Sequence, residues 1–372
     1  MKLVGKNLSV VAGFASVFRT CASSTWLKTG VSILAASMIV LVASTTGVTA
    51  ATSSDVTTNL NKTTVINDYQ NRLEPLLSVP TGWTGNVETC KAGTTSTENQ
   101  KATLSAVNYI RGLAALKPVK LNPTQSKQAQ KSALIQSASG WLSHTPDKSS
   151  ACWTKGGFEG ASHGNLFLSS GYDDELAPST GARAVVGYME DSGGNNIRVG
   201  HRRWILFSGL KTIGSGDTDN ANTLVVISPK YTPQRGSTFT PWPTAGYFPR
   251  ELEPLGRWSL TSPNSNFTKA KVTVTTPDGP VKINQHCAEN GYGDNTLVWD
   301  MELPEGYRTD PIADYPVEVK VTGIRLPNGS TVKRAWTTTL VHAGVAPPSS
   351  LVPPPDENTS WTSSCETFFF KG

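Results

Sequence analysis

The sequence predicts an α+β protein in which a helix–sheet sandwich is followed by an all-β, sandwich-like domain. The length of 372 residues suggests two domains rather than one. Apolar residues recur at helical spacing in the first part of the chain, whereas beyond about Thr232 they alternate along short segments. With 37% hydrophobic and 16% charged residues, the composition indicates a globular rather than a disordered chain.

Residues 1–50 have the pattern of an export signal. An apolar run spans residues 31–43, and as a helix it would cover only about 20 Å of the roughly 30 Å hydrocarbon core. We predict cleavage after Ala50 and a secreted, extracellular mature chain, with membrane contact only through this signal segment; an uncleaved anchor is the alternative. The segment carries no acid and four basic residues: Lys2, Lys6, Arg19 and Lys28.

The charge of the mature chain excludes one class of partner. The whole chain carries a formal charge of +5, and loss of the four basic residues of the signal leaves +1. A near-neutral chain lacks the basic footprint of nucleic-acid binding, so no nucleic-acid partner is expected.

The cysteine count agrees with export. Cys21 leaves with the signal, and the four that remain predict two disulfides, for which sequence alone allows three connectivities. We favour Cys90–Cys152 and Cys287–Cys365, because each bridge then stays within one half of the chain. A four-cysteine zinc site is not expected, since the sequence has no C-x-x-C pair.

The first half should begin with helices. Residues 51–96 form an N-terminal extension with a short helix over 63–73, which Pro75 ends or kinks. A longer helix is expected over about 98–116, from apolar residues at three-residue steps. Another should run from Pro123 to about Leu142 with Asn122 as its N-cap. Its inward face is predicted from Leu134, Ala138 and Trp141, with small Ala129, Ala133 and Ser137 allowing close approach of another element.

Shorter elements complete a domain over residues 97–230. Residues 156–172 are rich in glycine and serine and read as a loop or short helix, and residues 180–191 as a short helix. Residues 203–207 and 223–227 look like strands. We expect residues 60–230 to fold without residues 240–372.

The second half should be a β-sandwich over residues 231–345. Alternating apolar residues separated by turn sequences predict its strands. Residues 346–372 form a proline-rich linker and tail. The alternating positions are Val272 and Val274; Leu297, Trp299 and Met301; Val317, Val319 and Val321; and Trp336 and Leu340.

Candidate chemistry is concentrated in the histidines of the first half. His144, His163 and His201 lie at predicted element ends or in loops, where sites are usually built. Glu190 and Asp191 precede His201 by about ten residues, and histidines with a carboxylate suit zinc binding or acid–base work. Spacing alone also allows three unrelated loop histidines. The sequence lacks a G-x-S-x-G elbow, an H-E-x-x-H helix and a phosphate-binding loop.

Motifs over residues 100–227 resemble the CAP superfamily of cysteine-rich secretory, venom-allergen and plant pathogenesis-related proteins, with the bacterial secreted branch as the best likeness. Several motifs occur in the family's order, which is more specific than any one of them. They are the helix with Asn108 and Arg111 followed by Leu116, Pro118, Val119 and Leu121; Ala129, Gln130 and Ala133; Leu142-Ser143-His144-Thr145; His163-Gly164-Asn165-Leu166; Gly187-Tyr188-Met189-Glu190-Asp191; Val199-Gly200-His201-Arg202-Arg203-Trp204-Ile205-Leu206; and Ile213-Gly214-Ser215-Gly216-Asp217.

The resemblance implies an α-β-α sandwich with a cleft of two histidines and two acids that holds a divalent metal in some members. His144 and His201 match the two histidines, and Asp191 stands for the second acid. Gly164 occupies the position of the first acid, and neighbouring His163 is the candidate substitute. We therefore expect at most weak metal binding, with zinc as the candidate ion and His144, His201 and Asp191 as its ligands.

Three functional hypotheses follow. The first is an extracellular binding or interaction module in which His144, His163, Asp191 and His201 line a cleft for a small lipid-like ligand, a protein or a wall polymer. The second is a metal-assisted or acid–base hydrolase in which His144, Asp191 and His201 are catalytic. The third is polymer binding by aromatic residues of the β domain. We expect binding rather than catalysis, because no nucleophile is paired with a base in the sequence and the acid set is incomplete.

Overall fold

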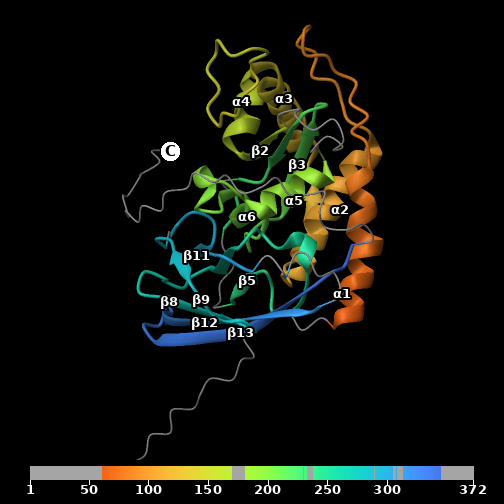
Figure 1. The fold of residues 1–372 in the computed structure, drawn as a ribbon. Helices are drawn as coiled ribbons and strands as arrows, with labels where there is room; N and C mark the ends of the chain where they lie inside the picture. Colours follow the sequence, from red (N-terminus) through yellow and green to blue (C-terminus); the bar gives the residue numbers. More distant parts are fainter. Residues whose placement is uncertain are drawn as a thin grey trace, which may run out of the picture. The chain divides into compact units, whose positions relative to one another are not determined.

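A computed structural model describes residues 61–169, 181–228, 230–232, 238–288, 290–304, 307 and 313–344. The chain divides into two units, Met1–Thr49 and Ala50–Gly372, and all described residues belong to the second (Figure 1). The predicted signal segment and the predicted linker and tail, residues 346–372, lie outside the described residues. Among the described helices none has the length and hydropathy needed to cross a bilayer.

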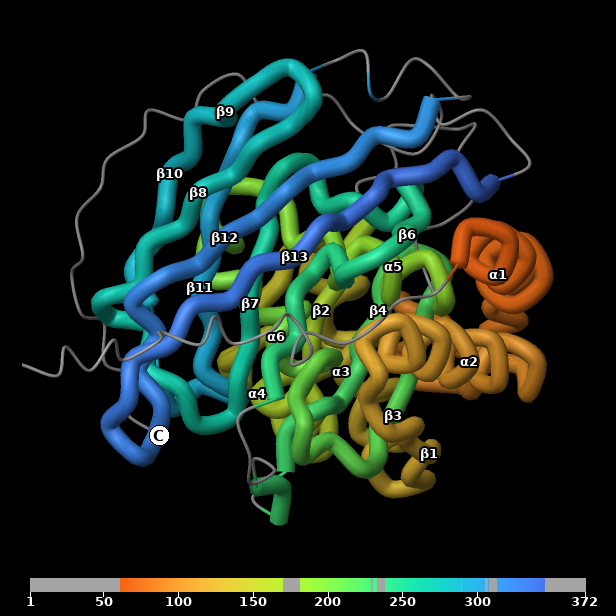
Figure 2. Tube along the Cα trace, turned by 90° about the horizontal axis from the view of Figure 1, so that it is seen from below, coloured from red at the N-terminus to blue at the C-terminus, as the bar shows by residue number. Residues whose placement is uncertain are grey.

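The N-terminal extension is helical over a longer stretch than its sequence predicts. Helix α1, Lys62–Asp68, continues as a π-helical turn, Tyr69–Leu73, and then as a 3₁₀ turn, Glu74–Ser78. Pro75 does not end the helical path, because it sits in the first turn of the 3₁₀ segment, where no amide donor is needed. Helix α1 lies beside strand β6 of the second half, and Lys62 pairs with Asp314 at 2.6 Å (Figure 2).

Two long helices follow the extension. Helix α2 spans Thr97–Leu113 with Ser96 as its N-cap, and helix α3 spans Pro123–Ser139. The predicted cap of α3 is confirmed, since the Asn122 side chain accepts hydrogen bonds from the amides of Thr124 and Gln125. The predicted end of α3 is wrong: left-handed Gly140 stops the helix, and Trp141 lies beyond it with 62% of its surface exposed.

The first sheet has the strand order β1-β3-β4-β2 and lies between helices. Strands β1 and β3 are parallel and the other pairs are antiparallel. Helices α3 and α4 both contact β2 and β4, and α3 also contacts β3. Helix α2 contacts β3, helix α5 contacts β2, and these two helices pack against each other (Figure 1). The close approach expected of α3 is confirmed: a Cβ on Gly216 of β3 would lie 2.1 Å from the Gln130 amide nitrogen. The strands are β1, Lys120–Leu121; β2, Gly164–Leu168; β3, Thr212–Asp217; and β4, Ala221–Val225.

Three short helices surround this sheet. They are α4, Lys155–Ser162; α5, Ala182–Glu190; and α6, Gly200–Ile205. The strand predicted over residues 203–207 is wrong, because α6 occupies most of this segment and buries the guanidinium groups of Arg202 and Arg203. Such a short apolar run does not distinguish helix from strand by its period.

The second half contains two sheets, with the orders β10-β11-β7-β5 and β6-β13-β12-β8-β9. Trp299 of β11 faces Trp336 of β13, with ring centroids 6.4 Å apart, so the two sheets pack together as a sandwich. The alternating apolar positions predicted for residues 272–340 are buried. The strands are β5, Thr240–Trp242; β6, Gly246–Pro249; β7, Arg257–Ser262; β8, Lys271–Thr276; β9, Gly279–Val281; β10, Ile283–Gln285; β11, Asn295–Met301; β12, Tyr315–Arg325; and β13, Thr331–Val341.

One predicted disulfide is confirmed in full, since Cys90 is bonded to Cys152. Cys287 is also disulfide-bonded, and its expected partner Cys365 lies outside the described residues.

The buried apolar residues of both halves form one hydrophobic cluster, in which Ile205 and Phe207 of the first half join Trp258 and Leu297 of the second. The predicted domain boundary near residue 230 therefore crosses a continuous core.

Candidate functional site

His201 and Asp191 form a hydrogen-bonded pair at the start of α6. The Nδ1 atom of His201 lies 2.7 Å from Oδ1 of Asp191, whose side chain is fully buried, whereas 21% of the His201 side chain is exposed. Because a carboxylate oxygen accepts, Nδ1 of His201 donates this hydrogen bond, and in the neutral form of the ring Nε2 is the acceptor. Among the described residues no hydrogen-bond partner of this Nε2 is found.

The fold holds Asp191 by its backbone and its side chain. It caps the C-terminus of α5 in a left-handed conformation, φ 54°, and its amide bonds to the carbonyl of Gly187. Its second carboxylate oxygen accepts the amide of Arg202 at 3.1 Å. Both oxygens of Asp191 therefore have protein donors, one from the histidine ring and one from the first turn of α6.

Tyr188 of α5 and Asn165 of β2 support His201. The rings of Tyr188 and His201 lie 5.3 Å apart, and the buried Tyr188 hydroxyl reaches the side-chain oxygen of Asn222 at 2.7 Å. Asn165 donates to the backbone carbonyl of His201 at 3.1 Å. Burial raises the pKa of Tyr188 well above its ordinary value, so the hydroxyl stays protonated and acts as a donor.

His144 lies near this pair. Its Nδ1 is 3.0 Å from the carbonyl of Ala161, although much of the residue remains exposed to solvent. Desolvation of the ring lowers the pKa of His144, the hydrogen bond to Ala161 opposes this effect, and the electrostatic interaction with His201 adds a smaller lowering. The lowered pKa favours the neutral form of His144 at pH 7, and the two rings interact electrostatically.

His163 has different partners. Its Nδ1 lies 2.9 Å from the carbonyl of Glu159 and 3.0 Å from the hydroxyl of Ser162, both in α4. Its backbone carbonyl accepts the amides of Val226 and Ile227. The contacts of this ring thus connect it to its own helix rather than to His144 or His201.

Gly164, the position of the expected first acid, has no room for a side chain. It begins β2, and a Cβ there would lie 2.8 Å from the carbonyl oxygen of Gly160 and 2.9 Å from Cγ2 of Thr223. Real Cβ atoms are essentially never found at such distances. An acid at this position would require α4 to move away from the sheet.

Comparison with known proteins decides the family of this half. Residues 104–228 match the model of the CAP, or cysteine-rich secretory protein, family. Residues 104–228 are a CAP domain. A structural match is an extracellular protein containing an SCP domain from Bacillus anthracis, with 17% identity and a TM-score of 0.26, covering 34% of this chain and 39% of that one. The chain thus spans well under half of that protein's length, and no curated protein matches it.

The CAP resemblance implies a divalent metal, but the residues present do not fit one well. Asp191 gives both oxygens to protein donors, and Gly164 supplies no ligand. Two imidazole Nε2 atoms remain, fewer than the three protein ligands of a catalytic zinc site. Within the described ranges no group of three or more histidine, cysteine or acidic side chains is arranged to hold a metal ion.

Residues of the second half complete the surroundings of the CAP site, and sequence analysis missed them. Arg257 of β7 donates from one nitrogen to the carbonyls of Asp191 and Gly193, at 2.9 and 2.8 Å. Tyr292 lies next to Gly200, and its ring is 5.2 Å from that of Trp204. Arg257 is separated from Asp191 by 66 residues, and a single basic residue in a strand carries no sequence signal of that contact.

Proposed function

We propose that the CAP domain works outside the cell as a binding module whose ligand contacts His144 and His201. The observation that carries this proposal is the position of the exposed large apolar side chains, which in the described part of the chain are four. Trp141 and Leu142 precede His144, Ile197 precedes His201, and Tyr292 lies beside Gly200. Three of these side chains are near the two histidines in the sequence and the fourth contacts α6, and exposed apolar groups next to polar groups are a feature of interaction sites.

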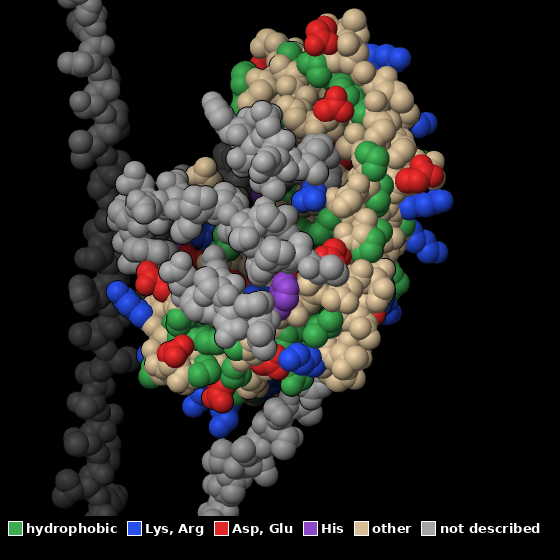
Figure 3. All heavy atoms as spheres, turned by 45° about the vertical axis from the view of Figure 1, so that its right-hand side comes forward, with side chains coloured by type: hydrophobic (Ala, Val, Ile, Leu, Met, Phe, Trp, Pro, Cys, Tyr) green, Lys and Arg blue, Asp and Glu red, His purple; other side chains and the backbone are tan. Residues whose placement is uncertain are grey.

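The chemistry of the surface favours an amphipathic ligand. Trp141 and Ile197 expose 62% and 40% of their surface and would bury it against an apolar chain. His201 offers an Nε2 acceptor oriented by Asp191, and His144 offers a neutral ring. A small lipid-like molecule with one polar end satisfies both features. Figure 3 shows basic and acidic side chains interspersed over the visible face, which is unlike the basic surface of a nucleic-acid binder.

One observation favours a hydrolase as a second candidate. A histidine base oriented by a buried carboxylate is the arrangement that activates a nucleophile in acyl transfer, and His201 with Asp191 reproduces it at 2.7 Å. In the described residues no serine, threonine or cysteine side chain is bonded to His201. Binding therefore remains the better-supported proposal.

Polymer binding through the β domain has less support. Trp242, Trp258 and Trp299 are fully buried, and Trp336 exposes only 8% of its surface. Buried rings serve the core and cannot present a stacking platform.

The experiment is a titration of the secreted chain with a fluorescent long-chain fatty acid as amphipathic probe. Saturable binding is expected, and the double variant His144→Ala/His201→Ala should weaken it at least tenfold. Lys62→Ala, at an exposed pair with Asp314, is the control and should bind as the wild type does. Equal affinity of the double variant and the wild type would overturn the proposed site. Retention on purified cell-wall polymer without probe binding would favour the polymer hypothesis instead.

A further inference from the structure

The hydrogen bond between His201 and Asp191 depends on a segment with little regular structure. Asp191 ends α5 in a left-handed conformation, and the chain then passes through Gly193, φ 86°, and a 3₁₀ turn, Gly194–Asn196. Val199, which caps α6, is also left-handed, at φ 46°. Left-handed conformations at residues other than glycine cost about 1 kcal/mol or more, so surrounding contacts have to hold this loop.

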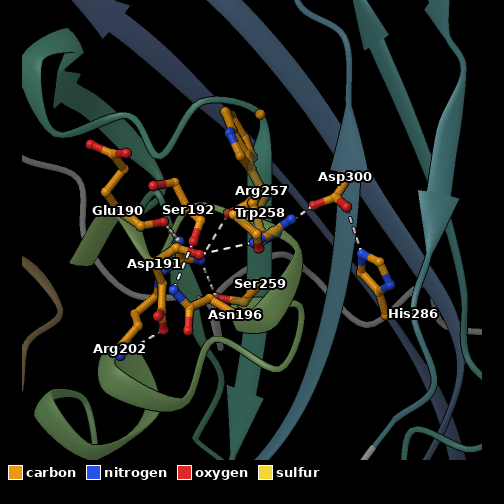
Figure 4. A network of polar contacts seen from close by, with 12 residues as sticks. Glu190, Asp191, Ser192, Asn196, Arg202, Arg257, Trp258, Ser259, His286 and Asp300 are labelled. Carbon is orange, nitrogen blue, oxygen red and sulfur yellow. Dashed lines mark hydrogen bonds and ion pairs between the residues drawn. The ribbon is translucent and has the colours of Figure 1, made fainter. Parts of the chain in front are cut away.

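Arg257 supplies such contacts from the other half of the protein. Its Nη1 donates to the carbonyls of Asp191 and Gly193, which flank the turn after α5. The Arg257 side chain is only 12% exposed, and its bond to the Asp191 carbonyl is partly buried, whereas its bond to the Gly193 carbonyl is exposed. Figure 4 shows Arg257 extending from β7 toward Asp191 on one side and Asp300 on the other.

Arg257 is itself fixed by two further side chains. Its Nε donates to Asp300 at 2.7 Å, and the other oxygen of Asp300 lies 2.6 Å from Nε2 of His286. Desolvation acts to raise the pKa of Asp300, but the bonds from His286 and Arg257 outweigh it and lower the pKa. Asp300 is therefore ionised and anchors the guanidinium group.

A reciprocal contact closes the arrangement. Arg202, which follows His201, donates to the backbone carbonyl of Arg257 at 2.8 Å and to the hydroxyl of Ser259 at 3.2 Å. It also donates to the carbonyls of Met189 and Glu190 at the end of α5. The two arginines thus connect the end of α5, the start of α6 and strand β7 (Figure 4).

We propose that Arg257 is a positioning residue for the CAP site. Asp300 and His286 hold Arg257, and Arg257 fixes the loop that presents Asp191 to His201. The site is therefore complete only when the second half of the chain is present. This inference rests on the proposed function only in that His201 contacts the ligand. The arrangement itself is independent of which ligand that is.

The test follows the Nδ1 proton of His201 by NMR in the full secreted chain. In the wild type, this proton should be shifted downfield and should exchange slowly with water, because it lies between the ring and a buried carboxylate. In Arg257→Met, we expect its exchange to become at least tenfold faster and its downfield shift to be reduced. Asp300→Asn, which keeps one acceptor for Arg257 and removes the charge, should produce a smaller change in the same direction.

A matched control separates positioning from general loss of stability. Arg250→Met removes another buried arginine of the same half, one that donates to the carbonyl of Ala313. It should lower the melting temperature comparably and leave the His201 proton unchanged. The proposal is overturned if Arg257→Met leaves the His201 signal as it is in the wild type, or if Arg250→Met disturbs it equally.

Binding of the fatty-acid probe then distinguishes the two proposals. Weaker binding by Arg257→Met together with the altered signal supports both of them. An altered signal with unchanged binding supports positioning by Arg257 and overturns the role of His201 in ligand contact.

Discussion

Gly164 occupies the position at which the CAP resemblance predicts an acid, and the residues around it show which contacts replace that acid. Helix α4 packs so closely on β2 that the carbonyl of Gly160 occupies the space of a side chain. Asn165, one residue later, bonds to the His201 carbonyl instead. The site is therefore built around a single carboxylate, Asp191, whose oxygens serve the histidine and the α6 amide.

The close packing at Gly164 leads to a stability prediction. Gly164→Ala should destabilise the fold by about 1–3 kcal/mol, because the new methyl group would overlap backbone and side-chain atoms that cannot retreat. Urea unfolding measures the loss. Gly112→Ala, near the end of α2 with open space around it, is the control and should be neutral or slightly stabilising. A neutral Gly164→Ala would show that α4 can move, and that an acid could be accommodated there.

Asp300 leads to a prediction for pH dependence. Its folded-state pKa is held below the ordinary value of about 3.9, so its contribution to stability is complete above that pH and is lost as pH falls through the folded pKa. Asp300→Asn should cost about 1–3 kcal/mol at pH 7 and should flatten the decline of stability below about pH 4. Unfolding free energies measured from pH 7 to pH 2 test this. Asp219→Asn, at an exposed residue, should run parallel to the wild type, and a parallel curve for Asp300→Asn would contradict the assignment.

Metal affinity is the third expectation at this scale. Zinc titration by calorimetry should give little heat, because Asp191 is engaged by His201 and Arg202 and only two imidazole Nε2 atoms remain. His144→Ala/His201→Ala should abolish whatever heat is seen. Tight binding that survives this double change would place a metal site elsewhere in the chain.

At the scale of elements, the sequence predicted helices with strong caps better than short segments. Asn122 and Pro123 fixed the start of α3 correctly, since cap chemistry is local. The end of α3 was missed because Gly140 interrupts an apolar pattern that continues into Trp141. Helix α6 was mistaken for a strand because its stability comes from buried arginines that bond across the molecule, which no local pattern reveals.

The Cys90–Cys152 bridge connects the N-terminal extension to the segment before α4, and its removal is testable. The two cysteines are 62 residues apart, so the bridge should contribute about 4 kcal/mol in the chain-entropy model. Cys90→Ser/Cys152→Ser should lose about that amount in urea unfolding without reductant. Dithiothreitol should then lower the stability of the wild type more than that of the double variant. Equal stability of the two proteins before reduction would show that the extension is held by packing alone.

At the scale of the whole molecule, the change from helical to alternating periodicity correctly predicted two architectures. The candidate site could be predicted in part: His144, His201 and Asp191 were indicated by the CAP resemblance, and Asp191 and His201 are hydrogen-bonded. Arg257, Asp300 and Tyr292 could not be predicted, because their contacts with the CAP domain join residues far apart in the sequence. Because of these contacts, we no longer expect the two halves to fold separately.

Truncation after residue 230 tests how far the halves depend on each other. The truncated chain would lose the carbonyl partners of Arg203 at Tyr292 and Asp294 and the carboxylate partner of Ser208 at Asp294. Buried guanidinium groups without partners are costly, and the apolar face shared with Trp258 and Leu297 would become exposed. We expect residues 51–230 alone to melt without the cooperative transition of residues 51–372. Addition of residues 231–372 as a separate chain should restore part of that transition. A cooperative melt of the truncated chain at the temperature of residues 51–372 would instead show that the CAP half has a sufficient core of its own, and that its contacts with β7 and β11 serve the site rather than the fold.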